Sequence, residues 1–163
     1  KMFFKNSHNS NLYNILLTLS RNIFFYKDLS FKDTFETRLY LMFFHYSIIL
    51  IISKNKEYKI DQKNYNNLFY SIEYNLRELG FGDISVNKKM KNFNKIFYDI
   101  LLKLNYGKAN FKLNKDIFIT YFENLAQNGD NLKKCEMYFK KFYNFCFDIP
   151  PQHMIERLKD FKY

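Results

Sequence analysis

The chain has 163 residues, a net charge of +10, and apolar and aromatic shares of 47% and 21%. This length and apolar content exclude a disordered chain and predict a single domain over residues 1–163. The positive charge favours anionic partners such as RNA, ribosomes or acidic lipid head groups, with a solvated lysine-rich surface as the alternative.

Apolar residues recur at helical spacing from the start of the chain, and patterns typical of strands are weak. The first helix is expected to begin with Ser10 or Asn11 as its cap. Residues 22–32 are expected to be irregular, with three consecutive aromatic residues packing onto the body. Asp33 then predicts a capping-box-like start of a long apolar helix that runs to about Ser53.

The run LYLMFFHYSIILII at residues 39–52 is the most membrane-like segment of the chain. It has fourteen residues, whereas a spanning helix needs about 20. Charged residues before it, Glu36 and Arg38, and after it, Lys54 and Lys56, leave no room to extend it. The sequence therefore predicts a central core helix and no transmembrane helix.

Three further helices are expected after the polar connection at residues 54–63. Asp61 is expected to cap the first of them, which ends at Gly80 in the left-handed conformation. Ser85 is expected to cap a long amphipathic helix that is closed by Gly107, and a third helix starts after a linker.

The last part of the chain continues the helical pattern. We expect helices starting at Asn114 and at Asp130, and a short final helix over residues 152–162 with Pro151 in its first turn. Together these elements predict an all-α fold, a single-domain helical bundle of about six to eight helices.

Residue types that bind metals are scattered in this sequence. His8, His45 and His153 form no pair at a short spacing, so we expect no metal and no cofactor. For His45, inside the apolar run, we expect a buried, hydrogen-bonded histidine, with a haem ligand as the alternative. Cys135 and Cys146 lie eleven residues apart in one predicted helix, about 16 Å by helical rise, which predicts two reduced cysteines in a reducing compartment.

The first residues, KMFFKNSHNSNLYN, contain neither a long apolar run nor a small-residue cleavage site. They therefore predict no secretory signal, with a transit peptide already removed as the alternative. Lys1 before Met2 is interpreted as a tag remnant, with Met2 as the natural start.

The most informative segment is LRELGFGDISVNKKMK at residues 76–91. Its GFGD turn is too short for a phosphate-binding loop and follows a helix instead of a strand. Glu73 and Glu78 are five residues apart, which argues against an acid–base pair, so we expect no catalytic residues. We predict a partner-binding surface on a rigid turn, formed by Arg77, Glu78, Asp83, Lys88, Lys89 and Lys91. The alternative is a helix–turn–helix joint with a solvated basic face. Gly80 and Gly82 are predicted to be structural.

Two blocks of the sequence resemble the ubiquinol–cytochrome c chaperone family. The first runs from Arg21 to His45 and carries Arg21, Phe25, Tyr26, Asp33, Thr34, Arg38 and His45 in the family's order. The second carries Leu76, Arg77, Glu78, Gly80, Gly82, Asp83, Val86, Lys88, Lys89 and Met90. Together they cover most of residues 12–105. The chain departs from the pattern at residues 22–23 and at Asn87, where a proline is usual, and at Thr37, where a glycine is usual.

The resemblance implies a non-enzymatic assembly chaperone for the cytochrome bc1 complex that binds newly made cytochrome b or an assembly intermediate. It implies work near the ribosome, with a small helical partner, peripheral to the membrane. We expect a bacterial protein in the cytoplasm at the inner face of the membrane, or a mitochondrial matrix protein as the alternative. Two other functions stay open: a basic helical module that binds RNA or the ribosome, and a helical protein that binds lipid or quinone.

Overall fold

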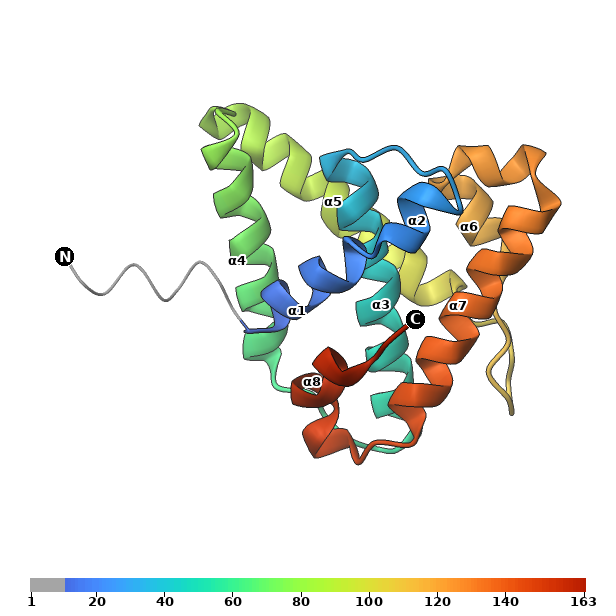
Figure 1. Cartoon of the computed structure of the whole chain (residues 1–163). Helices are drawn as coiled ribbons and strands as arrows, with labels where there is room; N and C mark the ends of the chain where they lie inside the picture. Colours follow the sequence, from blue (N-terminus) through green and yellow to red (C-terminus); the bar gives the residue numbers. More distant parts are fainter. Residues whose placement is uncertain (1–10) are drawn as a thin grey trace.

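The computed structural model describes residues 11–163, which are helical with no strand in that range (Figure 1). This confirms the predicted all-α bundle. Expectations about Lys1, His8 and Ser10 lie outside the described residues. The central element is α3 (Phe35–Asn55), and α1 (Asn11–Ser20), α5 (Asp83–Lys103) and α7 (Gly129–Phe147) pack around it.

The remaining helices cover the outside of this arrangement. They are α2 (Ile23–Lys27), α4 (Gln62–Glu78), α6 (Lys115–Tyr121) and α8 (Met154–Arg157). α4 packs against both α1 and α5, and α6 packs against α7. Short 3-10 turns at Glu123–Gln127, Pro151–His153 and Leu158–Asp160 connect or extend these helices.

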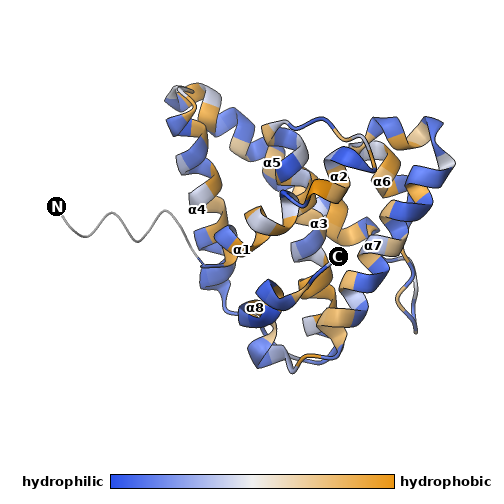
Figure 2. Ribbon diagram, viewed as in Figure 1, coloured by the Kyte–Doolittle hydropathy of each residue, from blue (hydrophilic) through white to orange (hydrophobic). Residues whose placement is uncertain are grey.

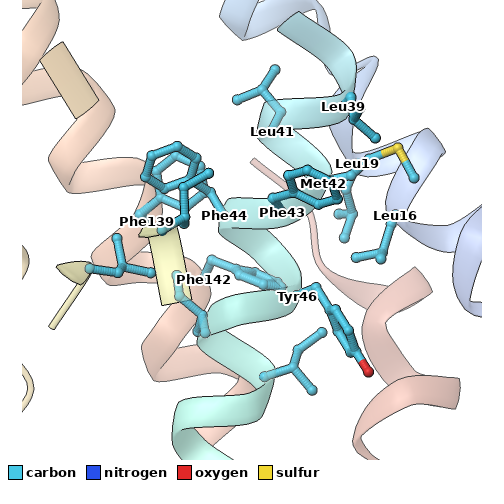
Figure 3. Close-up of a cluster of buried hydrophobic side chains, with 14 of the residues drawn as sticks. Leu16, Leu19, Leu39, Leu41, Met42, Phe43, Phe44, Tyr46, Phe139 and Phe142 are labelled. Atoms are coloured by element: carbon cyan, nitrogen blue, oxygen red, sulfur yellow. The ribbon is translucent and has the colours of Figure 1, made fainter. Parts of the chain in front are cut away.

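α3 is buried because other helices cover it on several sides. Phe43 packs edge-on against Phe97 of α5 with ring centroids 5.3 Å apart, and Phe44 stacks on Phe118 of α6 at 4.8 Å. Figure 3 shows Phe43 and Phe44 on different sides of α3, with Phe139 of α7 beside Phe44. Polar residues alternate with apolar ones along α4, α5 and α7, which therefore each bury one face (Figure 2).

α3 is also long and apolar enough to cross a membrane by length and composition. In its most apolar window, however, 61% of the residues are buried inside the structure, as in the core helix of a soluble protein. The central core helix is thus observed, whereas the absence of a transmembrane helix stays a prediction.

Two predicted helix caps lie close to the observed ones but are wrong. The side chain of Thr34, not Asp33, caps α3 by accepting a hydrogen bond from the backbone N–H of Thr37 at 3.2 Å. α5 begins at Asp83 after Gly82, which makes no side-chain cap, so Ser85 lies within the first turn. In both places several residues that could cap the helix lie within three positions of each other, and the local backbone geometry decides which of them is the N-cap.

Of the other predicted helix starts, two are capped by the expected residue and one is not. Asp61 and Asn114 cap α4 and α6 as expected, each accepting from the backbone N–H two residues further on. Asn128, rather than Asp130, caps α7. α5 ends at Lys103, earlier than expected, so Gly107 lies in the following loop instead of closing the helix.

Two segments differ from their predicted secondary structure. Residues 22–32, expected to be irregular, contain the single-turn helix α2, although Phe24 and Phe25 are buried as predicted. The predicted final helix over residues 152–162 is divided into a 3-10 turn, α8 and a second 3-10 turn. Pro151 does occupy the first position of the first turn. Met154, Leu158 and Phe161 still anchor this segment in the core.

Both cysteines are free and buried, as predicted. Burial raises the pKa of the Cys135 and Cys146 thiols, so both remain protonated at neutral pH and behave as small apolar side chains.

Candidate functional site

The turn between α4 and α5 occupies one corner of the molecule, away from α7 (Figure 1). Gly80 has a φ of +97°, a conformation that side chains with a Cβ rarely adopt. The N–H of Gly80 donates to the carbonyl of Arg77 at 3.0 Å, and the N–H of Phe81 donates to that of Leu76 at 3.3 Å. These two bonds form a Schellman motif, which ends α4 sharply and fixes the direction of the chain.

Arg77 holds the turn by bridging the two helices. Its guanidinium donates to Glu73 at 3.1 Å within α4 and to Asp83 at the start of α5. The hydrogen bonds to Asp83 and then Glu73 raise the pKa of Arg77. The structure therefore brings together Arg77 and Asp83, as the sequence suggested, but not Glu78. Glu78 instead accepts a hydrogen bond from the hydroxyl of Tyr74, and its charge raises the pKa of that tyrosine.

The predicted lysines lie on the part of α5 that follows the turn. Lys88 and Lys91 are exposed, because the buried side of α5 is formed by Val86, Phe93 and other apolar residues. Lys89 is half-buried, and its Nζ lies 4.6 Å from the centre of the Phe81 ring. This cation–π contact ties the lysine to the turn.

The sequence reasoning missed the apolar centre of this corner. Leu79, Phe81 and Ile84 are 60%, 38% and 88% exposed, and we call these three residues the turn patch. The signal was present in the sequence, since Ile84 is out of phase with the helical stripe through Val86 and Phe93. An apolar patch rimmed by charged residues is typical of a protein–protein or membrane interaction site.

The family model for "Ubiquinol-cytochrome C chaperone" matches residues 27–108, which is half of the chain. The chain belongs to the ubiquinol–cytochrome c chaperone family. No curated protein and no solved structure matches it. The matched range contains the whole turn between α4 and α5 and all of α3. Membership supports an assembly chaperone role in general, and therefore a client protein as partner.

Most residues of the first family block serve the fold of this chaperone. Arg38 pairs with Asp33 across the start of α3, and Thr34 caps that helix. The hydroxyl of Tyr26 donates to the carbonyl of Ser20 at 2.6 Å, which joins α2 to the end of α1. These contacts fix the connections between the first three helices.

His45 is fully buried in the middle of α3 of the chaperone. Its Nδ1 lies 2.6 Å from the carbonyl of Leu41, and its Nε2 lies 2.7 Å from the hydroxyl of Tyr138 on α7. Burial lowers the pKa of His45 to about 4, so the ring is neutral at pH 7. Nδ1–H then donates to Leu41, and Nε2 accepts from Tyr138. This confirms the buried, hydrogen-bonded histidine, and both ring nitrogens are occupied, which leaves neither for a haem iron.

Arg21 is the one member of the first block that stands apart from these contacts. It follows α1 directly, is exposed, and forms no ion pair within residues 11–163. Together with Arg38 it lines a cavity between α1, α3 and α4 of about 210 Å³. Over the same residues, no group of three or more His, Cys, Asp or Glu side chains could hold a metal ion.

Proposed function

We propose that this chain is a non-enzymatic assembly chaperone of the cytochrome bc1 complex that holds newly made cytochrome b through the corner formed by α4 and α5. The observation that carries the proposal is the turn patch, an exposed apolar surface within the range matched by the family model. Cytochrome b is a membrane protein, so a chaperone that holds it before assembly needs apolar surface that is free to contact it.

The rigidity of the corner supports this assignment. Ile84 is 88% exposed, and Leu79 precedes the left-handed Gly80. The Schellman motif and the bridging Arg77 hold these side chains in place before a partner arrives. A contact surface that is already ordered loses less conformational entropy on binding, which favours affinity.

Charged residues surround the turn patch and are suited to orienting a bound partner. Lys88 and Lys91 are exposed beside the turn patch, and Arg77 and Asp83 lie at its edge. Charges at the rim of an interface steer encounter and fix register more than they add affinity. We assign Arg77, Asp83 and the lysines to this rim, and Glu78 to the side of α4 that carries Tyr74.

The location and the further partners belong to the same proposal. The chaperone acts peripherally at the cytoplasmic face of a bacterial membrane or in the mitochondrial matrix, near the ribosome and with a small helical partner. The net charge of +10 supports attraction to anionic lipid or ribosomal RNA at such a place.

The test combines a deletion strain with a matched pair of surface variants. Deleting the gene is expected to lower the amount of assembled bc1 complex, and restoring the wild-type gene to recover it. Ile84→Ser removes an apolar side chain from the turn patch, whereas Met137→Ser removes one that is 64% exposed on α7. We expect Ile84→Ser to retain about tenfold less cytochrome b in a pull-down, and Met137→Ser to behave as wild type.

The possible outcomes separate the proposal from its alternatives. Unchanged bc1 in the deletion strain would refute the chaperone function as a whole. Equal retention of cytochrome b by the two variants would refute the assignment of the surface. Tight RNA binding that weakens steeply with salt, with no retention of cytochrome b, would favour an RNA-binding module instead.

A further inference from the structure

The cavity between α1, α3 and α4 is bordered by two arginines and shares Leu79 with the turn patch. Its volume is about 210 Å³, and its apolar wall includes Leu39, Met42 and Ile72, all buried. Polar side chains occupy its edge, among them Arg21 at the end of α1 and Arg38 in the first turn of α3. An apolar pocket with a few convergent polar groups is the usual form of a small-molecule site.

Arg21 and Arg38 line the same cavity, the first just after the end of α1 and the second in the first turn of α3. Burial raises the pKa of both Tyr13 and Tyr26. The positive charges of Arg21 and Arg38 act in the opposite direction on both tyrosines. Both arginines therefore act within the same small region, where α1 ends and α3 begins. Tyr13 lines the cavity with them, and its hydroxyl accepts a hydrogen bond from Asn75 at 2.7 Å.

The positive charge of this pair is only partly balanced. Arg38, whose side chain is 26% exposed, pairs with Asp33, whose side chain is 71% exposed. Arg21 forms no ion pair with any residue of 11–163. On the opposite side of the cavity Glu78 contributes one carboxylate, which is held by Tyr74. Planar guanidinium groups suit carboxylates, which they can bind through two parallel hydrogen bonds.

We propose that this cavity binds an amphipathic monocarboxylate, whose apolar tail lies against Leu39, Met42 and Ile72 and whose carboxylate is held by Arg21 and Arg38. The tail has roughly six to eight carbon atoms, because a cavity of about 150 Å³ already accommodates benzene. The cavity fits both parts of such a ligand. Burial of the apolar tail supplies affinity, and the arginines favour a negatively charged head group. The site does not depend on the chaperone function, and either can be refuted without the other.

The head-group dependence of binding is the first test. Octanoate, octanol and octylamine share one tail, and each is titrated calorimetrically into the full chain at pH 7.5 and fixed ionic strength. We expect octanoate to bind at least tenfold more tightly than octanol, and octylamine not to bind. Acetate, which has the head group without the tail, is expected to show no binding. Octanol binding as tightly as octanoate would overturn the proposal.

Three variants locate the site. Arg21→Gln is expected to weaken octanoate binding about tenfold, and because Arg21 forms no ion pair in the described residues, the fold should be unaffected. Glu78→Gln is expected to strengthen binding roughly twofold to fivefold by removing a like charge. Lys91→Gln removes a positive charge from exposed α5 outside the cavity and is the matched control. Equal weakening by Arg21→Gln and Lys91→Gln would show a general charge effect and overturn the assignment.

Discussion

The sharpest prediction of stability concerns the two glycines of the turn, which lie two positions apart and differ in backbone conformation. Gly80 has a φ of +97°, whereas Gly82 has a φ of −77°. Neither has an atom within 4 Å of the place where a Cβ would stand, so crowding does not distinguish them. Gly80→Ala and Gly82→Ala therefore add the same methyl group, and backbone strain is the main difference between them.

The expected magnitudes follow from that difference. Alanine in a left-handed conformation is less favourable than glycine by about 1–2 kcal/mol. Gly80→Ala should therefore lower the free energy of unfolding by about that amount. Gly82→Ala should change it by less than about 0.5 kcal/mol, because the gain from restricting the unfolded chain is offset by the weaker preference for alanine than for glycine at the N-cap of α5.

Urea unfolding followed by circular dichroism at pH 7 measures both variants against wild type. In a thermal melt, a loss of 1 kcal/mol corresponds to a shift of about 2–4 °C for a protein of this size. The reasoning is refuted if Gly80→Ala is as stable as Gly82→Ala. A loss of about 1 kcal/mol or more for Gly82→Ala would also contradict it, since Gly82 has a negative φ and only the weaker N-cap preference of alanine opposes the substitution.

Three other predictions address the buried histidine and the basic row. Tyr138→Phe leaves Nε2 of His45 without a donor and should lower the free energy of unfolding by about 1–3 kcal/mol in urea titrations, with an unchanged stability contradicting the assigned bond. The pKa of His45 is about 4 in the folded chain and 6.5 in the unfolded chain, so its contribution to the free energy of unfolding is complete above pH 6.5. It should be lost as pH falls toward 4, by about 3 kcal/mol, and a His45→Gln variant with the same pH dependence would exclude this source. Replacing Lys88, Lys89 and Lys91 by Glu should lower bc1 assembly with an unchanged circular dichroism spectrum, and normal cytochrome b levels would exclude these lysines from the partner surface.

The long helices could be predicted from the sequence because their apolar residues repeat over several turns. α3 was located by its apolar run, and α5 by the stripe that includes Phe93 and Phe97. α2 could not be found in this way, since five residues make little more than one turn and show no period. The caps at Thr34 and Asn128 were missed because neighbouring aspartates also favour the cap position.

The candidate site was only partly predictable, for a different reason. The Arg77–Asp83 pair joins residues six apart around one turn, so it could be predicted from the local sequence. The hydrogen bond between His45 and Tyr138 joins residues 93 apart, and the cavity is lined by three helices. Neither could be predicted from the sequence, because only the folded chain brings these residues together. The turn patch was missed because the sequence analysis considered only the charged residues and glycines of this turn, although the phase of Ile84 in α5 places it outside.

The two family blocks have different physical roles in this chain. In the first, Thr34, Tyr26 and His45 direct their polar atoms to the backbone or to another buried side chain, so they are saturated within the fold. In the second, Lys88 directs its side chain to solvent, as does Ile84, which lies within this segment but is not one of the residues that match the family pattern. Contacts of the first kind stabilise the scaffold, whereas these exposed side chains are free to contact a partner. This difference is why we propose the partner surface in the second block, at the turn that the scaffold holds in place.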